Sequence, residues 1–125
     1  MRINQRVLVF DAADLAAESG FWNCVLNGTV KVYERWHMVF VDDKPVLGIQ
    51  LAPDHVPPDW PDGTQQQIHL DLWVDDAEVA HSEVMSLGAK LLQPARDETP
   101  ETVDNYRVYA DPAGHPFCIC WVVER

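Results

Sequence analysis

Apolar and polar positions follow the same order twice along the chain. Residues 7–28 run from a short apolar segment through Asp11 into a stretch with apolar residues at helical spacing. Residues 68–88 repeat that order around Asp75, which has a glutamate three positions later, as in a capping box. The pattern predicts a strand and then a helix in each half. The aspartate is the expected N-cap, and a glycine closes each helix.

The segments that follow these two openings have the apolar pattern of β-structure. Residues 30–51 contain two strand-like runs around a polar turn, which predicts a hairpin. In the second half, strands are predicted at residues 90–92, 106–110 and 116–123, with a polar loop at residues 94–104. The prediction is an α+β fold of two βαβββ modules, which form a curved mixed sheet around a concave pocket.

A proline-rich segment separates the two modules. Residues 53–67 contain four prolines and a glycine, which predicts a semi-rigid linker. Module one is therefore expected to span residues 1–52 and module two residues 68–125. A chain of 125 residues has the usual size of one domain, so we expect residues 1–125 to form a single domain.

Composition narrows the range of partners. The net charge of −11 argues against binding to nucleic acid or to an anionic membrane surface, because both require a basic face. No apolar run is long enough for a membrane span, and no secretory signal is visible at the N-terminus. Three cysteines, two of them on one face of a predicted strand, are expected to be reduced, which favours a cytoplasmic location.

Three segments of the second half resemble a known family. They are HLDLWVDD at residues 69–76, GAK at residues 88–90, and YADPAGHPFC at residues 109–118. Together they are similar to signatures of the glyoxalase/bleomycin-resistance/extradiol dioxygenase superfamily, also called the vicinal oxygen chelate superfamily. Within it, the chain resembles the small bacterial glyoxalase-like domain proteins. The resemblance implies an internal pocket for a small molecule, and we expect a homodimer.

The resemblance also implies where a metal would be held. Metal-dependent members use four inward positions, on the first and last strands of each module, usually filled by His and Glu. Alignment of the two halves through their predicted N-caps puts Gln5, Gln50, His69 and Cys118 at these positions. Both acidic ligands are absent, so the expectation is a degenerate metal site with no resident cofactor. His69 is left as the candidate ligand if a divalent metal (Zn, Ni, Mn or Fe) binds. Cys118 could ligate zinc as a thiolate, although a lone thiol in a strand is more often simply buried.

Alternation along the second module's first strand predicts the wall of the pocket. His69, Asp71 and Trp73 share one face, and the intervening leucines face the helix. His69 is either a ligand contact, a general base or a metal ligand, with Asp71 able to orient it, or a structural histidine in the groove. Cys118 is expected to face the same pocket from the last strand.

Module one offers further candidates for ligand binding. Gln50 lies among small residues on its face, which leaves room for a ligand, although a cross-strand hydrogen bond is the alternative. Trp36 and Met38 share a face that lines either an apolar pocket or the core between sheet and helix. His37 lies on the opposite face and is not expected in the pocket.

Three functions are consistent with these residues. The first is binding of a small aromatic or amphipathic molecule, for which the acidic chain suggests a cationic ligand, by analogy with bleomycin-type antibiotics. The second, the alternative to binding, is a lyase, isomerase or dioxygenase that depends on a divalent metal. A metal-free form of this second function would use His69 as base and Gln50 as an oxyanion donor. The third is a structural or regulatory role with a vestigial pocket. We slightly favour small-molecule binding, or a metal-independent activity, over classical glyoxalase chemistry.

Overall fold

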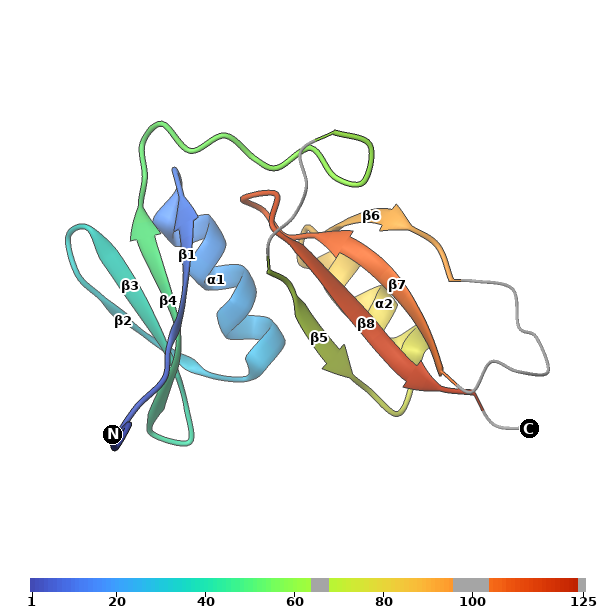
Figure 1. Ribbon diagram of the computed structural model, residues 1–125, viewed down its shortest axis with the longest axis horizontal. Helices are drawn as coiled ribbons and strands as arrows, with labels where there is room; N and C mark the ends of the chain where they lie inside the picture. The colour runs from blue at the N-terminus through green and yellow to red at the C-terminus, as the bar shows by residue number, and fades with distance from the viewer. Residues whose placement is uncertain (64–67, 96–103, 124–125) are drawn as a thin grey trace. The chain divides into compact units, whose positions relative to one another are not determined.

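The computed structural model describes residues 1–63, 68–95 and 104–123 (Figure 1). The chain divides into two compact units, Met1–Val56 and Pro57–Arg125. The division falls inside the segment predicted as the linker, residues 53–67. Residues 57–63 therefore belong to the second unit rather than to a spacer between the units.

The first unit is a four-stranded mixed sheet covered by one helix (Figure 1). Its elements are β1 (Leu8–Ala12), α1 (Leu15–Leu26), β2 (Thr29–Val32), β3 (Trp36–Val41) and β4 (Lys44–Leu51). The strand order is β1-β4-β3-β2, in which β1 runs parallel to β4 and the other pairs are antiparallel.

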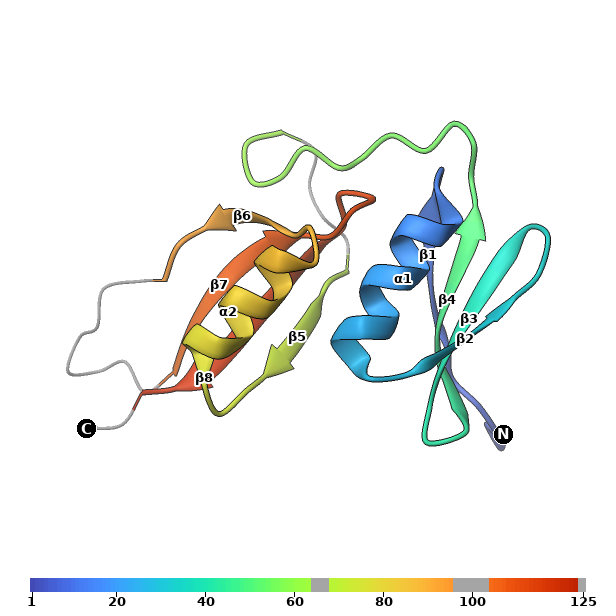
Figure 2. The same ribbon diagram turned by 180° about the vertical axis from the view of Figure 1, so that it is seen from behind.

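The second unit repeats this topology (Figure 2). Its elements are β5 (Leu70–Trp73), α2 (Ala77–Ser86), β6 (Lys90–Gln93), β7 (Asp104–Ala110) and β8 (Pro116–Val122). The order β5-β8-β7-β6 matches that of the first unit, again with one parallel pair. The predicted α+β fold of two βαβββ modules is confirmed. Most of the predicted loop at residues 94–104 lies outside the described residues.

The N-caps differ from the prediction in both modules. The Asp14 carboxylate accepts a hydrogen bond from the backbone N–H of Ala17, and Asp76 accepts one from Val79, each at 3.0 Å. Asp11 is instead part of β1, where it pairs with Gln50 of β4. Each module has more than one aspartate near the start of its helix. In the first module, β1 pairs with β4 as far as Ala12, so Asp11 lies in the strand and Asp14 caps the helix.

Each helix covers a buried face of its own sheet. In the first unit, Trp22 of α1 is fully buried, and Phe10 and Phe21 meet it edge-on. In the second unit, α2 is tied to β7 by two polar contacts. His81 Nδ1 lies 2.8 Å from the Tyr109 hydroxyl, and Arg107 donates to Glu78 at 2.6 Å. Among the described residues, no helix is long and apolar enough to cross a membrane.

Candidate functional site

A cavity of about 370 Å³ opens on the sheet of the second unit. It lies over the parallel pair β5 and β8, in which Asp71 is opposite Cys118 and Trp73 is opposite Cys120. Because side chains alternate along a strand, these four residues share the pocket face. The residues that line the cavity all belong to the second unit: Trp60, His69, Asp71, Trp73, Gln93, Asn105, Tyr106, Val108, Cys118 and Cys120.

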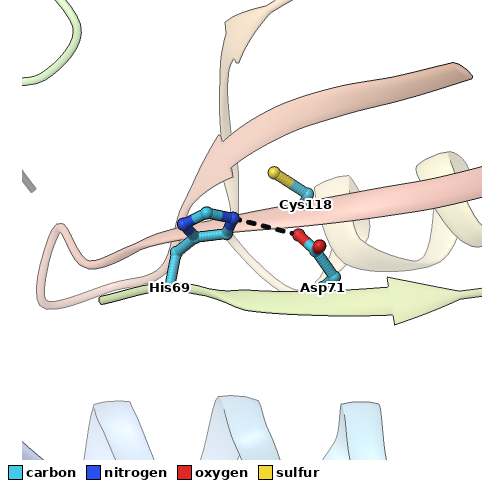
Figure 3. A group of neighbouring side chains, drawn as sticks. All are labelled: His69, Asp71 and Cys118. Carbon is cyan, nitrogen blue, oxygen red and sulfur yellow. Dashed lines mark ion pairs between the residues drawn. The ribbon is translucent and has the colours of Figure 1, made fainter. Parts of the chain in front are cut away.

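Three chemically active side chains meet in this cavity (Figure 3). His69 stands one residue before β5, and its Nε2 lies 3.1 Å from Asp71 Oδ1. The Cys118 thiol comes from β8, and one ligand atom of each residue lies within 4.8 Å of the others. The His69 and Asp71 side chains are 39% and 47% exposed, so their ion pair contributes little to stability and mainly orients the imidazole.

The Cys118 thiol is held in its neutral form. Burial raises its pKa to about 12, and the Asp71 charge, Cys120 and a hydrogen bond with Asp71 act in the same direction. The thiolate is the nucleophilic form of cysteine, so the metal-free thiol is unreactive near neutral pH. Covalent catalysis by Cys118 is therefore disfavoured in the metal-free protein.

The raised pKa of Cys118 predicts a loss of stability at alkaline pH. The neutral thiol contributes its full stabilisation at a pH below the pKa that Cys118 has in the unfolded chain. This contribution is lost progressively as the pH rises toward about 12. The loss is at most about 1.4 kcal/mol per pH unit. Urea unfolding at about pH 8 and about pH 10 should show a larger decrease for the native chain than for Cys118→Ala. The same measurement on Cys24→Ala, at an exposed site of α1, is the control; equal decreases in all three would contradict the prediction.

Aromatic side chains form part of the cavity wall. Trp60 and Tyr106 pack against the buried cluster of Val108, Cys118 and Cys120. Trp73 lines the same cavity and is 58% exposed. Stacking surface of this kind suits a flat organic molecule.

Sequence reasoning missed five of the described lining residues: Trp60, Gln93, Asn105, Tyr106 and Val108. Trp60 was assigned to the linker, although a tryptophan among prolines was a signal of packing. Gln93, Asn105 and Tyr106 lie on or beside β6 and β7, and their approach to the cavity depends on strand register. Asn105 is 3% exposed, and its Oδ1 accepts a hydrogen bond from the backbone N–H of Tyr106 at 2.8 Å.

The predicted ligand contacts of module one lie together on the first sheet. Trp36 is opposite Gln50 in the β3–β4 pair, and Met38 is opposite Gly48. The intervening His37 faces α1, where its Nδ1 lies 2.7 Å from the Ser19 hydroxyl. Trp36 and Met38 therefore face away from the helix, and packing between sheet and helix is ruled out for them. Their contact with a ligand, and that of Gln50, stays a prediction.

The observed N-caps change the equivalence between the two modules. With Asp14 matched to Asp76, the counterpart of His69 is Val7, not Gln5. Asp71 corresponds to Val9, and the parallel strand pairs then match Cys118 to Gly48. The first unit thus carries no ligating side chain at the positions equivalent to the three.

Gln5 is placed elsewhere in the first unit. It precedes β1 and lines a separate cavity of about 520 Å³ together with Arg6 and Lys44. By the same strand pairing, Gln50 corresponds to Cys120 rather than to Cys118. In this alignment, Val7 and Gly48 replace Gln5 and Gln50 among the four positions expected for a metal, whereas His69 and Cys118 keep theirs.

The fold is that of glyoxalase-type proteins. The chain belongs to the glyoxalase-like domain family, within the vicinal oxygen chelate superfamily, since the sequence profile of that family matches residues 7–120. A comparison with curated proteins found no match.

Solved structures share the fold at low sequence identity. The fosfomycin resistance protein FosX from Mesorhizobium loti is 16% identical, with a TM-score of 0.68 over 97% of this chain and 93% of that one. A glyoxalase-related enzyme from Fulvimarina pelagi is 19% identical, with a TM-score of 0.66 over 95% and 88%.

A further relative was solved with bound molecules. A variant of FosX from Listeria monocytogenes, complexed with Mn(II) and 1S,2S-dihydroxypropylphosphonic acid, is 11% identical to this chain. Its TM-score is 0.69 over 95% of this chain and 90% of that one. At such identities, the likeness establishes the fold alone.

Proposed function

We propose that this protein binds a small, flat organic molecule in the cavity of the second unit, without requiring a metal. The observation that carries the proposal is the cavity itself, about 370 Å³, with aromatic side chains in its wall and a His–Asp pair beside them. This size and this mixture of apolar surface with few polar groups are typical of small-molecule sites. His69, Asp71, Trp73 and Cys118 are the proposed contacts, with Trp60 and Tyr106 added from the structure.

The charges of the lining favour a cationic ligand. Among the described residues that line the cavity, Asp71 is the acidic one, and none is lysine or arginine. Three aromatic side chains line the same space, and aromatic faces attract cations. The net charge of −11 acts in the same direction. A phosphonate, as in the Listeria FosX complex, would meet a carboxylate here without a lysine or arginine in the described lining.

His69 is the proposed proton acceptor if a reaction follows binding. When Nε2–H donates to Asp71, the proton is on that nitrogen and Nδ1 is left as the basic atom. The Asp71 carboxylate then fixes the tautomer and orients the ring, as a carboxylate beside a catalytic histidine does.

Three probes of similar shape and different charge test the proposal: N-methylquinolinium, neutral quinoline and naphthalene-1-sulfonate. Isothermal titration calorimetry in the presence of EDTA should show the cation binding most tightly and the sulfonate least. Asp71→Asn should weaken N-methylquinolinium about tenfold, the equivalent of about 1.4 kcal/mol, and leave quinoline almost unchanged. Failure of all three to bind, or equal affinity for cation and anion, would overturn the proposal.

Tryptophan fluorescence locates the bound probe. Quenching by N-methylquinolinium should decrease in Trp60→Phe and Trp73→Phe, whose side chains line the cavity. Trp121→Phe is the matched control, because Trp121 is not among the described residues that line the cavity. Its ring lies against Arg107, whose Cζ is 5.3 Å from the ring centroid. Trp36→Phe and Gln50→Ala test the predicted contribution of the first unit.

A metal-dependent lyase, isomerase or dioxygenase reaction is the second candidate function. The cluster of His69, Asp71 and Cys118 favours it, because imidazole, carboxylate and thiolate are all metal ligands. When bound, a divalent metal would supply Lewis-acid activation of substrate oxygens.

A homodimer is also proposed on the basis of the family, and a cytoplasmic location on the basis of the three free cysteines. Light scattering tests the dimer.

A further inference from the structure

We propose that the cavity beside the start of β4 in the first unit binds a small organic phosphate, with Arg6 and Lys44 as its anion-binding side chains. This cavity has a volume of about 520 Å³, and residues 3–6 and 44–46 line it. All of them belong to the first unit. The proposal goes beyond the proposed function, which concerns the cavity of the second unit and a ligand of the opposite charge.

The cavity lies where the pairing of β1 with β4 stops. The first pair of that parallel ladder joins Leu8 to Leu47. Continuing the register backwards would put Arg6 opposite Pro45, but proline has no backbone N–H and is typical of a position where pairing ends. Residues 3–6 therefore stay outside β1 and run beside the turn between β3 and β4 without joining the sheet (Figure 1). The space between this segment and the start of β4 is the cavity.

The charges around this cavity are unusual for so acidic a chain. The sequence has 20 acidic and 9 basic residues, yet the described lining holds one arginine, one lysine and no carboxylate. Asp42 and Asp43 precede Lys44 in the turn. Even so, no described carboxylate forms an ion pair with Arg6 or Lys44. Two cations that are not neutralised by the protein make this cavity a local site for an anion.

The chemistry of the lining favours a phosphate group with an organic body. The guanidinium of Arg6 can donate two parallel hydrogen bonds to phosphate oxygens, and Lys44 adds a second positive charge. The amides of Asn4 and Gln5 are further donors. An organic body would contact the apolar residues of the lining, which are Ile3, Pro45 and Val46.

The second unit provides an internal comparison. In the corrected alignment of the two modules, Arg6 corresponds to Ile68 and Lys44 to Gly114. The pair of cations is thus a property of the first unit and not of the repeated topology, so one phosphate ligand per chain is expected. Two solvated surface cations beside an open groove are the competing explanation, which predicts no saturable binding and no preference for an anion.

Titration of the ¹⁵N-labelled full chain with phenyl phosphate tests the site, at about pH 8, where the phosphate is mostly a dianion. Backbone amide resonances of residues 3–6, Lys44 and Val46 should shift and saturate. A Kd of about 0.1–1 mM is expected, because the contacts are few and exposed. Phenol should cause no saturable shift. Inorganic phosphate should bind more weakly than phenyl phosphate, because it lacks the apolar contacts.

Charge-removing variants identify the anion-binding side chains. Arg6→Gln and Lys44→Gln keep a hydrogen-bond donor but lose the charge, and each should weaken phenyl phosphate about fivefold, as expected for an exposed charge pair. The double variant should not bind measurably. Arg35→Gln and Lys31→Gln are the matched controls and should bind as the native chain does, because both residues are in the first unit and outside the described lining. All four side chains are exposed, so the variants should fold.

Three results would overturn the proposal: no saturable shift at the lining residues, equal affinity for phenol and phenyl phosphate, or equal losses in the variants and their controls. Inorganic phosphate that binds as tightly as phenyl phosphate would contradict the organic body.

The test is separate from that of the second unit's cavity. Asp71→Asn should leave phenyl phosphate binding unchanged, and the Arg6→Gln/Lys44→Gln double variant should leave N-methylquinolinium binding unchanged. Any naphthalene-1-sulfonate that binds the first unit's cavity would be lost in the same double variant. The comparison of cation and anion at the second unit can therefore be made in that variant.

Discussion

Trp22→Ala should lower the free energy of unfolding by about 3–5 kcal/mol, as expected when a large buried aromatic side chain is removed. Trp22 is 0% exposed, and its ring meets Phe10 and Phe21 edge-on, with centroids 5.8 Å and 5.2 Å away. The substitution leaves a cavity between α1 and its sheet. Small domains are stable by only about 5–15 kcal/mol, so a loss of this size is a large fraction of the total stability.

Urea unfolding followed by far-ultraviolet circular dichroism measures this loss without depending on tryptophan emission. Trp36→Ala is the matched control, because Trp36 is 39% exposed and stacks on Tyr33 at the surface with centroids 4.9 Å apart. Its cost should be much smaller. If the two variants lose equal stability, Trp22 does not have the central packing role described for α1.

Two glycine-to-alanine substitutions should change stability in opposite directions. At Gly28, a Cβ would collide with the backbone oxygen of Phe40 and lie 3.1 Å from Val39 Cγ1. A backbone oxygen within a paired strand cannot move aside easily, so Gly28→Ala should cost about 1–3 kcal/mol. At Gly20, inside α1, a Cβ would meet nothing within 4 Å, and Gly20→Ala should add about 0.5–1 kcal/mol through helix propensity.

Thermal unfolding of the two single variants and of the native chain gives both signs in one experiment. Gly20→Ala serves as the control for Gly28→Ala, because the same methyl group is added in the same unit. A stabilising Gly28→Ala would mean that β3 can withdraw from the end of α1. A destabilising Gly20→Ala would mean that α1 packs more closely at Gly20 than described.

Much of the second unit's pocket could be predicted from local pattern. Alternation along a strand depends only on the sequence of that strand, so the common face of His69, Asp71 and Trp73 followed directly. Cys118 was assigned to the same face from alternation in β8. The βαβββ order was readable for the same reason, since apolar periodicity and capping residues are local signals.

The missed features depend on contacts between distant segments. Trp60 approaches the cavity through tertiary packing on Val108, which no local pattern records. The choice between Asp11 and Asp14 as the N-cap depends on how far β1 pairs with β4, a property of the sheet and not of the helix. That choice changed which residue of the first unit corresponds to His69.

The two units share one topology, but equivalent positions in them tolerate different amino-acid substitutions. In the first unit, Val9 and Gly48 need only fit the sheet, and at Gly48 a Cβ would lie 3.3 Å from a Val9 methyl. At the equivalent positions of the second unit, Asp71 and Cys118 place a carboxylate beside a thiol in the cavity wall. A duplicated scaffold of this kind lets one copy supply rigidity while the other changes its chemistry, so new specificities can arise in half a protein without refolding the rest.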